Sequence, residues 1–328
     1  MAGIKDVALA AGVSIATVSH VLNSTRYVSD ETRKKVEKAM KDLSYSPNYL
    51  AKSLKENRSN VVGLVVPDIS NFFFTEIAGA IETTLRKYGY NLILCNTDEN
   101  FQQEKEHISH LQSYMVSGMI IAPTTREYNY RKLFNSYNYP VVFIDRRLNT
   151  PQGDSVYVDT KSVSKKAVEY LIGKGHRRIA FIGASRSIST TEDRFEGYSE
   201  ALKEHDIPLD MNHVGFGGAK DDSGYEVCGR ILEENDVTAL FVSTSMMTIG
   251  AMRYLVEKGI SIPDQIALIG FDDYMWTGIT NPPLSTIKQP TVELGETAAD
   301  ILIKRIADRN ADIRNVVLDA ELIIRQSC

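Results

Sequence analysis

Four charged side chains follow apolar runs that alternate with helix-like segments, and we predict these runs to be strands. Asp145 and Arg146 come directly after one such run, Asp272 follows another, and Arg194 opens the helix after a third. In open parallel sheets, ligands bind beyond the carboxyl ends of the strands. Carboxylate and guanidinium groups at such ends make the paired hydrogen bonds that hold a hydroxylated molecule. The pattern therefore predicts a small-molecule pocket.

Aromatic side chains occur at the same strand ends. Phe73 and Phe74 follow the first predicted strand of this region, and Trp276 follows the last of the strands named above. Aromatic faces stack on the C–H faces of a sugar ring, so this combination favours a sugar as the ligand. The alternative is that Asp145 and Arg146 only pair with each other and that Phe73 is a core residue.

A second set of candidate contact residues lies near the N-terminus, on a segment that predicts two short helices. Gly12 interrupts the first helix and Ser14 is placed to cap the second. Apolar residues at helical spacing give each helix one buried face: Ile4, Val7, Ala8 and Ala11, then Val18, Val21 and Leu22. Two helices joined by a tight turn form a helix-turn-helix, whose second helix enters the DNA major groove. The side chains predicted to face the bases are Ile15, Ala16, Thr17 and His20.

A third helix and a short fourth one are predicted next. Ser29 caps a helix that has Asp30 and Glu31 in its first turn, and Ser46 with Pro47 then opens a helix of only about eight residues. A helix that short is marginal in water by itself, so its order must come from packing against something else.

These segments resemble a known family. The motif IKDVALAAGVSIATVSHVLN is similar to the headpiece of LacI-family transcriptional regulators, the segment 45–55 is similar to their hinge helix, and the resemblance continues to the C-terminal RQS. It implies a homodimer on a pseudo-palindromic double-stranded DNA operator, with Leu54 inserted as an apolar wedge in the minor groove. Arg26 and Lys55 are further predicted DNA contacts. The alternative for Leu54 is a core position in the headpiece.

The remainder resembles ribose-type sugar-binding proteins. The matching segments are Asn71 with Phe73 and Phe74, Asp145-Arg146, Arg194-Phe195-Glu196-Gly197 and Gly270-Phe271-Asp272. The resemblance implies that these residues bind the effector. Two positions depart from the pattern: Thr244-Ser245 stands where Asn-Asp is usual, and Asp159-Thr160 followed by Val163 stands where Asp-Asn-x-x-Gly is usual. A pocket with fewer polar anchors predicts a modified or less hydroxylated sugar.

Alternation of strands and helices from Asn60 onward predicts parallel sheets covered on both faces. The predicted strands are Val61–Val66, Asn91–Cys95, Met119–Ala122, Val141–Ile144, Ile179–Ile182, a segment near Val214, Ala239–Val242 and Ile266–Ile269. The predicted helices are Phe73–Lys87, Phe101–Val116, Val163–Lys174, Thr191–Glu204, Ser223–Leu232, Met246–Lys258 and Val292–Ile306.

The expected fold class is thus α/β: an all-α helix-turn-helix headpiece with a hinge helix, then a two-lobed body like a periplasmic binding protein. The predicted boundaries are 1–46 for the headpiece, 47–59 for the hinge and 60–328 for the effector-binding and dimerisation body. Within the body we expect a first lobe of about 60–158 plus part of 289–315, and a second lobe of about 159–288 plus the C-terminal tail.

Charge is unevenly divided along the chain. The first 60 residues carry ten basic and six acidic side chains, a net of +4, whereas the whole chain has a net charge of −5, which leaves −9 on the remainder. A basic end on an acidic body suits a protein that contacts DNA with one end only. The alternative is a solvated charged surface.

Other sequence features point to a non-enzyme of the cytoplasm. The three cysteines are scattered, Lys5 and Asp6 interrupt any N-terminal apolar run, and no stretch has the roughly 18 apolar residues of a membrane span. We predict no cofactor and no metal site; His107 and His110 are more consistent with an exposed charged helix. No complete nucleophile or acid–base set is visible.

The sequence therefore predicts a DNA-binding transcriptional regulator, by the family's usual mode a repressor, that responds to a small sugar-like effector. Alternative effectors are a nucleobase or a phosphocarrier protein. The other classes considered are a transport-type binding protein, against which the attached headpiece argues, and an α/β enzyme.

Overall fold

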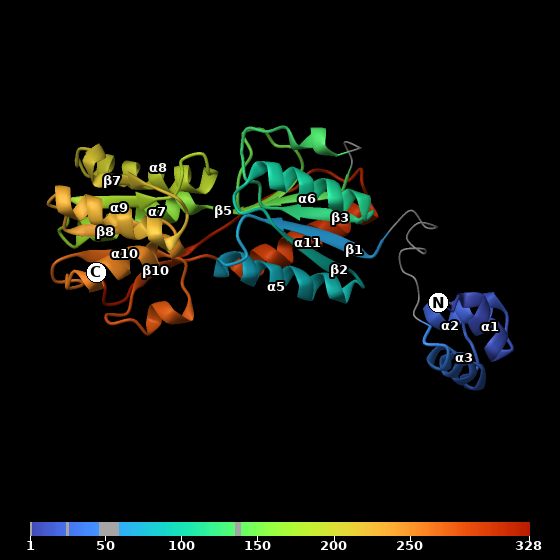
Figure 1. Cartoon of the computed structure of the whole chain (residues 1–328). Coiled ribbons are helices and arrows are strands. Elements are labelled where there is room, and N and C mark those ends of the chain that lie inside the picture. Colours follow the sequence, from blue (N-terminus) through green and yellow to red (C-terminus); the bar gives the residue numbers. More distant parts are fainter. Residues whose placement is uncertain (1, 24–25, 46–58, 135–138) are drawn as a thin grey trace. The chain divides into compact units, whose positions relative to one another are not determined.

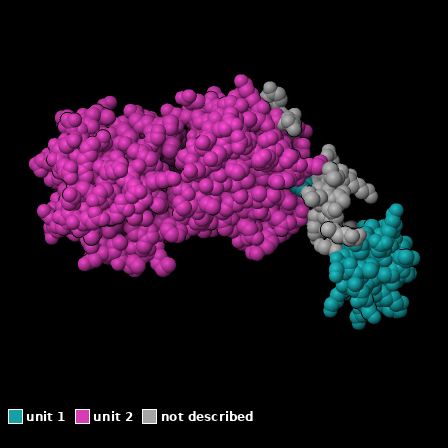
Figure 2. All heavy atoms as spheres, viewed as in Figure 1, with its two compact units in different colours: residues 1–59 teal, residues 60–328 magenta. Residues whose placement is uncertain are grey.

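The structure, a computed structural model, describes residues 2–23, 26–45, 59–134 and 139–328. The chain divides into two compact units, residues 1–59 and 60–328, which Figure 2 colours separately. The predicted hinge helix, with Leu54 and Lys55, lies outside the described residues. No single helix among the described residues is long and apolar enough to cross a membrane; Ile4–Ala11 and Ile15–Leu22 pass only as a pair bent by 103°.

The headpiece consists of three helices around a small apolar core. These are α1 (Ile4–Ala11), α2 (Ile15–Asn23) and α3 (Asp30–Asp42). Gly12 ends α1 with a left-handed φ of 65°, which glycine adopts without steric cost. The Ser14 hydroxyl accepts a hydrogen bond from the Thr17 backbone N–H at 3.0 Å, as an N-cap does. The buried core contains Val7, Ala8, Val18, Val21, Val36 and Ala39. Both predicted caps and both predicted helix faces are confirmed here.

The first lobe of the body is a six-stranded parallel sheet with the strand order β11-β5-β4-β3-β1-β2. Its strands are β1 (Val61–Val66), β2 (Asn91–Asn96), β3 (Gly118–Ile121), β4 (Val141–Ile144), β5 (Asp154–Val158) and β11 (Asn315–Leu318). Helices α5 (Phe72–Lys87) and α11 (Thr291–Ala307) share a buried cluster with Val62, Leu64 and Val66. Val65 instead packs in the cluster of α6 (Phe101–Ser113). Successive residues of β1 thus serve opposite faces of the sheet.

The second lobe repeats this plan with the strand order β12-β10-β9-β8-β6-β7. Its strands are β6 (Ile179–Gly183), β7 (Val214–Phe216), β8 (Ala239–Val242), β9 (Ala267–Phe271), β10 (Ser285–Lys288) and β12 (Glu321–Ile323), of which only β12 is antiparallel to its neighbour among the described pairings. Helices α7 (Thr160–Gly173) and α8 (Ser189–Glu204) share one apolar cluster with the sheet, and α9 (Asp221–Glu234) and α10 (Ser245–Glu257) share another. Three short 3₁₀ turns complete the body: η1 (Tyr130–Leu133), η2 (Met211–His213) and η3 (Met275–Gly278).

The chain passes between the two lobes three times. It crosses from β5 to α7, returns from β10 to α11, and crosses again from β11 to β12. Figure 1 shows the two lobes of the body side by side, with these segments between them. As a result, β11 and β12 complete the two sheets; the sequence analysis placed the C-terminal tail with the second lobe but predicted no strands in it.

Candidate functional site

The headpiece presents the predicted reading residues on the side of α2 away from its core. Ile15 is 45% exposed, and Ala16 is also exposed. Thr17 and His20 are half-buried, and the Thr17 hydroxyl lies 2.9 Å from the Ser14 hydroxyl. Arg26 is exposed beyond the end of α2. This face can meet a groove, whereas Val18 and Val21 hold the helix on the headpiece.

The body contains a cavity of about 700 Å³, part of it open to solvent, at the carboxyl ends of strands from both lobes. Its walls are Asp68, Asn71, Phe73, Phe74, Asp98, Glu99, Asp145, Arg146, Ala184, Ile188, Thr190, Thr191, Arg194, Ala219, Lys220, Thr244, Asp272 and Gln289. Seven of the eight predicted effector residues therefore lie around one cavity.

Trp276 is the exception, and the prediction that it lines the pocket is wrong. It lies in η3 and packs against the apolar cluster of α9 and α10 instead of the cavity. Phe73 and Phe74 line the cavity but are only 4% exposed each, with ring centroids 5.1 Å apart in an edge-to-face contact. They are thus core residues as well, so the aromatic surface of the cavity is limited.

Two buried aspartates face this cavity from corresponding places in the two lobes. Asp145 directly follows β4 and Asp272 directly follows β9; they are 7% and 5% exposed. Both have left-handed backbones, with φ of 63° and 65°, a strained conformation that persists only where the surroundings impose it. Burial raises the pKa of Asp145 to about 6, and burial also raises the pKa of Asp272.

Arg194 is the buried cation next to both aspartates. Its Nη1 donates a hydrogen bond to the Ser243 carbonyl at 2.6 Å, and its guanidinium lies 3.7 Å from the centroid of the Phe271 ring. Burial lowers its pKa, while the charges of Asp272 and Asp145 oppose this shift. Its Nε is buried and has no hydrogen-bond partner among the described residues, so one donor remains unsatisfied.

Arg146 is bound by a residue that the sequence analysis missed. Nη2 and Nη1 of Arg146 donate to Oε1 and Oε2 of Glu99 at 2.6 and 2.8 Å, and Nη1 also donates to the Pro123 carbonyl at 3.2 Å. The neighbouring Asp145 is farther away, with 3.6 Å between Arg146 Nε and Asp145 Oδ2. The main partner of Arg146 is therefore Glu99, and its contact with Asp145, the alternative considered from the sequence, is the weaker one.

Further lining residues were missed, although the strand-end rule indicates most of them. Asp98 and Glu99 follow β2, Lys220 follows β7, and Gln289 follows β10. Gln289 Nε2 donates to Asp272 Oδ1 at 2.6 Å. The predicted strands included β2 and the segment near Val214, so the same rule could have indicated Asp98, Glu99 and Lys220, whereas β10 was not predicted.

The two unusual residues Thr244 and Ser245 have local roles. The Thr244 hydroxyl accepts a hydrogen bond from the Met247 N–H at 3.3 Å and so caps α10. The Ser245 hydroxyl lies 3.4 Å from Asn71 Oδ1 of the other lobe. These short side chains stand where the family usually has an amide and a carboxylate, and their hydrogen bonds are made to other groups of the protein.

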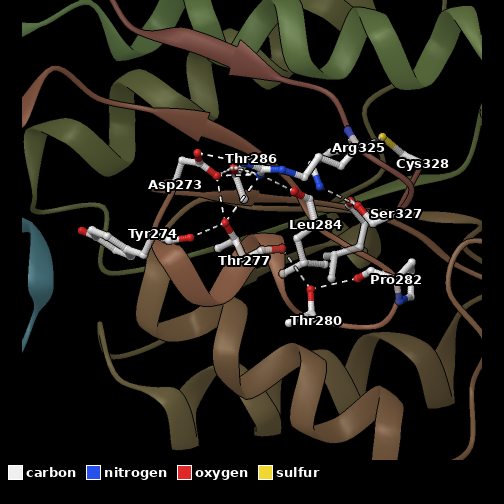
Figure 3. A network of polar contacts seen from close by, with 12 residues as sticks. Asp273, Tyr274, Thr277, Thr280, Pro282, Leu284, Thr286, Arg325, Ser327 and Cys328 are labelled. Carbon is white, nitrogen blue, oxygen red and sulfur yellow. Dashed lines mark hydrogen bonds and ion pairs between the residues drawn. The ribbon is translucent and has the colours of Figure 1, made fainter.

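The C-terminal segment fixes the loop that carries Asp272. Nη1 and Nη2 of Arg325 donate to Oδ1 and Oδ2 of Asp273 at 2.6 and 2.9 Å. Figure 3 shows this pair together with the hydroxyls of Thr277 and Thr286, which also donate to Asp273. Although burial alone would raise the pKa of Asp273, these hydrogen bonds, led by that of Arg325, lower it to about 2. The residue next to Asp272 is therefore held as an anion.

Polar contacts also join the lobes at the rim of the cavity. Arg147 forms an ion pair with Asp193 and its backbone N–H donates to the Ser189 hydroxyl at 2.9 Å. On another side, Lys220 Nζ lies 3.2 Å from Asp98 Oδ1. The Lys220–Asp98 pair is exposed and contributes little free energy, whereas Ser189 and Asp193 are buried at the Arg147 contact.

Two family models match the chain. Residues 3–48 match the model for bacterial regulatory proteins of the lacI family, and residues 59–326 match the model for periplasmic binding proteins and the sugar binding domain of the LacI family. The HTH-type transcriptional repressor PurR of Mannheimia succiniciproducens is 36% identical over 329 residues, which cover 100% of this chain and 98% of that protein.

Solved structures give the same result. A crystal structure of the Lac repressor dimer bound to operator and the anti-inducer ONPF has a TM-score of 0.87 and 28% identity, covering 99% of this chain and 98% of that one. The complex of the transcriptional regulator CelR with cellobiose has a TM-score of 0.76 and 28% identity, covering 100% of both chains.

Proposed function

The chain belongs to the LacI family of bacterial transcriptional regulators, and from this premise we propose that it is a repressor whose operator affinity is set by a small polyol-like effector bound between the lobes of its body. The observation that carries the proposal is that seven predicted effector residues, from both lobes, line a single cavity. A ligand there contacts both lobes at once and changes the free energy of closing them.

The chemistry of the cavity supports a hydroxylated effector. Asp145 and Asp272 accept hydrogen bonds from hydroxyl groups, and Arg194 has an unsatisfied Nε donor beside them. Phe73 and Phe74 supply a small apolar wall for the ring. A related regulator was solved with cellobiose, which supports a sugar or a sugar derivative for this chain.

The DNA partner is a pseudo-palindromic operator bound by a homodimer. A helix-turn-helix dimer places its two reading helices in successive major grooves, so the operator has matching half-sites. Ile15, Ala16, Thr17 and His20 are the proposed base-facing residues, and Arg26 contacts phosphate. A solved relative is a dimer on its operator.

The coupling between effector and DNA runs through the hinge in this proposal. Residues 46–58 lie outside the described residues, and their sequence predicts a helix of about eight residues. A helix that short needs a partner hinge and the minor groove to be ordered, with Leu54 as the wedge. A coupling free energy of about 1–3 kcal/mol corresponds to a 5- to 150-fold change in operator affinity.

The test is operator binding in the presence of candidate effectors. Fluorescence anisotropy with a selected operator, repeated across a panel of sugars and nucleobases, should find a compound that changes affinity within that range. His20→Ala should lose roughly 1–3 kcal/mol of discrimination at one position in each half-site. Unchanged base preference at every position would remove His20 from the reading set, and a protein without any sequence-selective DNA binding would contradict the function itself.

A further inference from the structure

The cavity has more carboxylates than cations. Five carboxylates line it: Asp68, Asp98, Glu99, Asp145 and Asp272. Three cations line it: Arg146, Arg194 and Lys220. The character of the ligand therefore depends on which of these cations has donors left to offer.

Two of the three cations are already paired with cavity carboxylates. Glu99 holds both Nη atoms of Arg146 at 2.6 and 2.8 Å, a bidentate geometry that matches how arginine grips a carboxylate or a phosphate. Lys220 is paired with Asp98 at 3.2 Å. Glu99 thus occupies the fork on Arg146 that an anionic ligand would use.

The backbone at Asp98 and Glu99, next to the contact with Arg146, is held in a strained conformation. Asp98 and Glu99 have left-handed φ values of 47° and 57°, which cost free energy in residues with side chains. Arg146 is only 7% exposed, so an unpaired guanidinium there would be costly, whereas Glu99 remains 33% exposed. A buried arginine is thereby neutralised by a residue at the cavity wall.

The remaining cation, Arg194, stands beside two aspartates. Its Nη1 is used by the Ser243 carbonyl, and its charge is shared between Asp145 and Asp272. Among the described residues, no hydrogen-bond donor satisfies the Asp145 carboxylate, whose ionic contact with Arg146 is 3.6 Å long. The buried centre of the cavity therefore carries an excess of negative charge, with two carboxylates to one guanidinium, although Arg194 Nε still lacks a hydrogen-bond partner among the described residues.

We infer that the effector is a donor-rich molecule without an anionic group, and that Glu99 is the residue that sets this specificity by occupying Arg146. The inference rests on the proposed function, because it names the chemical class that the effector cavity takes. Hydroxyl or amine donors on the ligand hydrogen-bond to Asp145 and Asp272. A phosphate or carboxylate is instead repelled by both carboxylates and finds Arg146 already occupied by Glu99, which leaves only Arg194, a single cation between two aspartates. Specificity of this kind excludes the wrong ligand by repulsion.

The experiment uses the full chain and matched pairs of compounds. Isothermal titration calorimetry is run with D-ribose and ribose 5-phosphate, D-glucose and glucose 6-phosphate, and cellobiose and cellobiose 6-phosphate. Any pair that binds should do so through its unphosphorylated member. A phosphorylated member that binds as tightly as its partner, or tighter, overturns the inference and leaves the proposed regulator function intact. Binding to none of the six compounds counts against the proposed function, and the next experiment then still decides the role of Glu99.

That second experiment uses inorganic phosphate as the probe. Glu99→Gln frees the two terminal nitrogens of Arg146 from a carboxylate. The variant should therefore bind phosphate roughly tenfold more tightly than the wild type or better, which corresponds to the free energy of about one charge-assisted hydrogen bond. The gain should vanish in Glu99→Gln/Arg146→Met. Glu127→Gln makes the same charge change at an exposed position outside the cavity and should behave as the wild type.

Several outcomes overturn the assignment of Glu99. One is a folded Glu99→Gln protein that gains no phosphate affinity over Glu127→Gln. Another is a wild type that already binds phosphate in a manner abolished by Arg146→Met. Should Glu99→Gln fail to fold, Glu99→Asp retains the charge but shortens the reach to Arg146, and the same gain, in smaller measure, is expected of it. The matched sugar pairs test the inference on the wild type without any variant.

Discussion

The two lobes place an equivalent aspartate at the cavity but support it differently. In the first lobe, Asp145 is followed by an arginine, Arg146, which is gripped by Glu99. Among the described residues, no hydrogen-bond donor satisfies the Asp145 carboxylate. Burial then raises the pKa of Asp145 to about 6.

In the second lobe, the residue after the cavity aspartate is acidic instead of basic. Asp272 is followed by another aspartate, Asp273, which Arg325 of the C-terminal segment grips with two hydrogen bonds (Figure 3). Asp272 itself accepts a hydrogen bond from Gln289 at 2.6 Å. The second lobe thus satisfies its cavity carboxylate from within the protein, whereas the first lobe leaves its carboxylate to the ligand. The same strand-end geometry therefore gives one carboxylate, Asp272, that is partly satisfied within the protein and one, Asp145, that depends on a ligand for its hydrogen bonds.

The largest effect is expected from breaking the support of the second lobe. Arg325→Met leaves Asp273, 15% exposed at its side chain, without its charged partner. Loss of one member of such a pair should cost about 2–4 kcal/mol in the free energy of unfolding, below the full value for a completely buried pair. Urea unfolding followed by the fluorescence of Trp276, the single tryptophan, reports on this lobe.

Lys304→Met is the matched control, because Lys304 is an exposed basic residue of α11. A stability loss in Arg325→Met no larger than in this control would show that the C-terminal contact does not support the lobe. The low pKa of Asp273 also predicts a pH dependence. The contribution of Asp273 to the free energy of unfolding is present above its unfolded pKa of roughly 4 and is lost as pH falls toward 2.

The next effect concerns the unsatisfied carboxylate of the first lobe. The folded pKa of Asp145 is about 6, above its unfolded value of roughly 3.9, so the folded state binds the proton more tightly. Stability from this group is fully present below the unfolded pKa and is lost as pH rises through about 6. Asp145→Asn, which mimics the neutral form, should therefore be more stable than the ligand-free wild type above pH ~7 by up to about 3 kcal/mol. At pH ~4 the two proteins should be alike.

Thermal or urea unfolding at several pH values measures this difference directly. If Asp145→Asn were equally destabilised at both pH values, the carboxylate would be satisfied in the folded protein and the contrast between the lobes would disappear. The same variant should lose affinity for the effector, because a ligand donor then meets an amide instead of a carboxylate.

The smallest effect is expected for the carboxylate that is already satisfied. Asp272→Ala should weaken the effector identified from the sugar panel by about 1–3 kcal/mol while operator binding persists. Its response to effector should then disappear at concentrations that saturate the wild type. Asp264→Ala, at an exposed position after α10, is the control. Calorimetry that finds full affinity in both Asp272→Ala and Arg146→Ala would remove the proposed site.

Local sequence signals determined much of this fold. Gly12, Ser14 and Ser29 mark helix ends because caps act through neighbouring backbone groups. Val61–Val66, Val141–Ile144 and Ala239–Val242 have the predicted bounds, because a continuous apolar run is what a strand buried on both faces requires. The strand-end rule then brought residues from distant segments to one cavity, since parallel strands share an edge for their carboxyl ends.

Tertiary structure alone decided the remainder. Strands β5, β10, β11 and β12 are short and partly polar, and they become strands because pairing with neighbours satisfies their backbones. Trp276 turns into the core because η3 directs it there. The bond between Glu99 and Arg146 joins residues 47 positions apart, at the ends of strands that are not adjacent in the sheet. Periodicity records which face of an element is buried, but it carries no information on which charged groups from different elements meet.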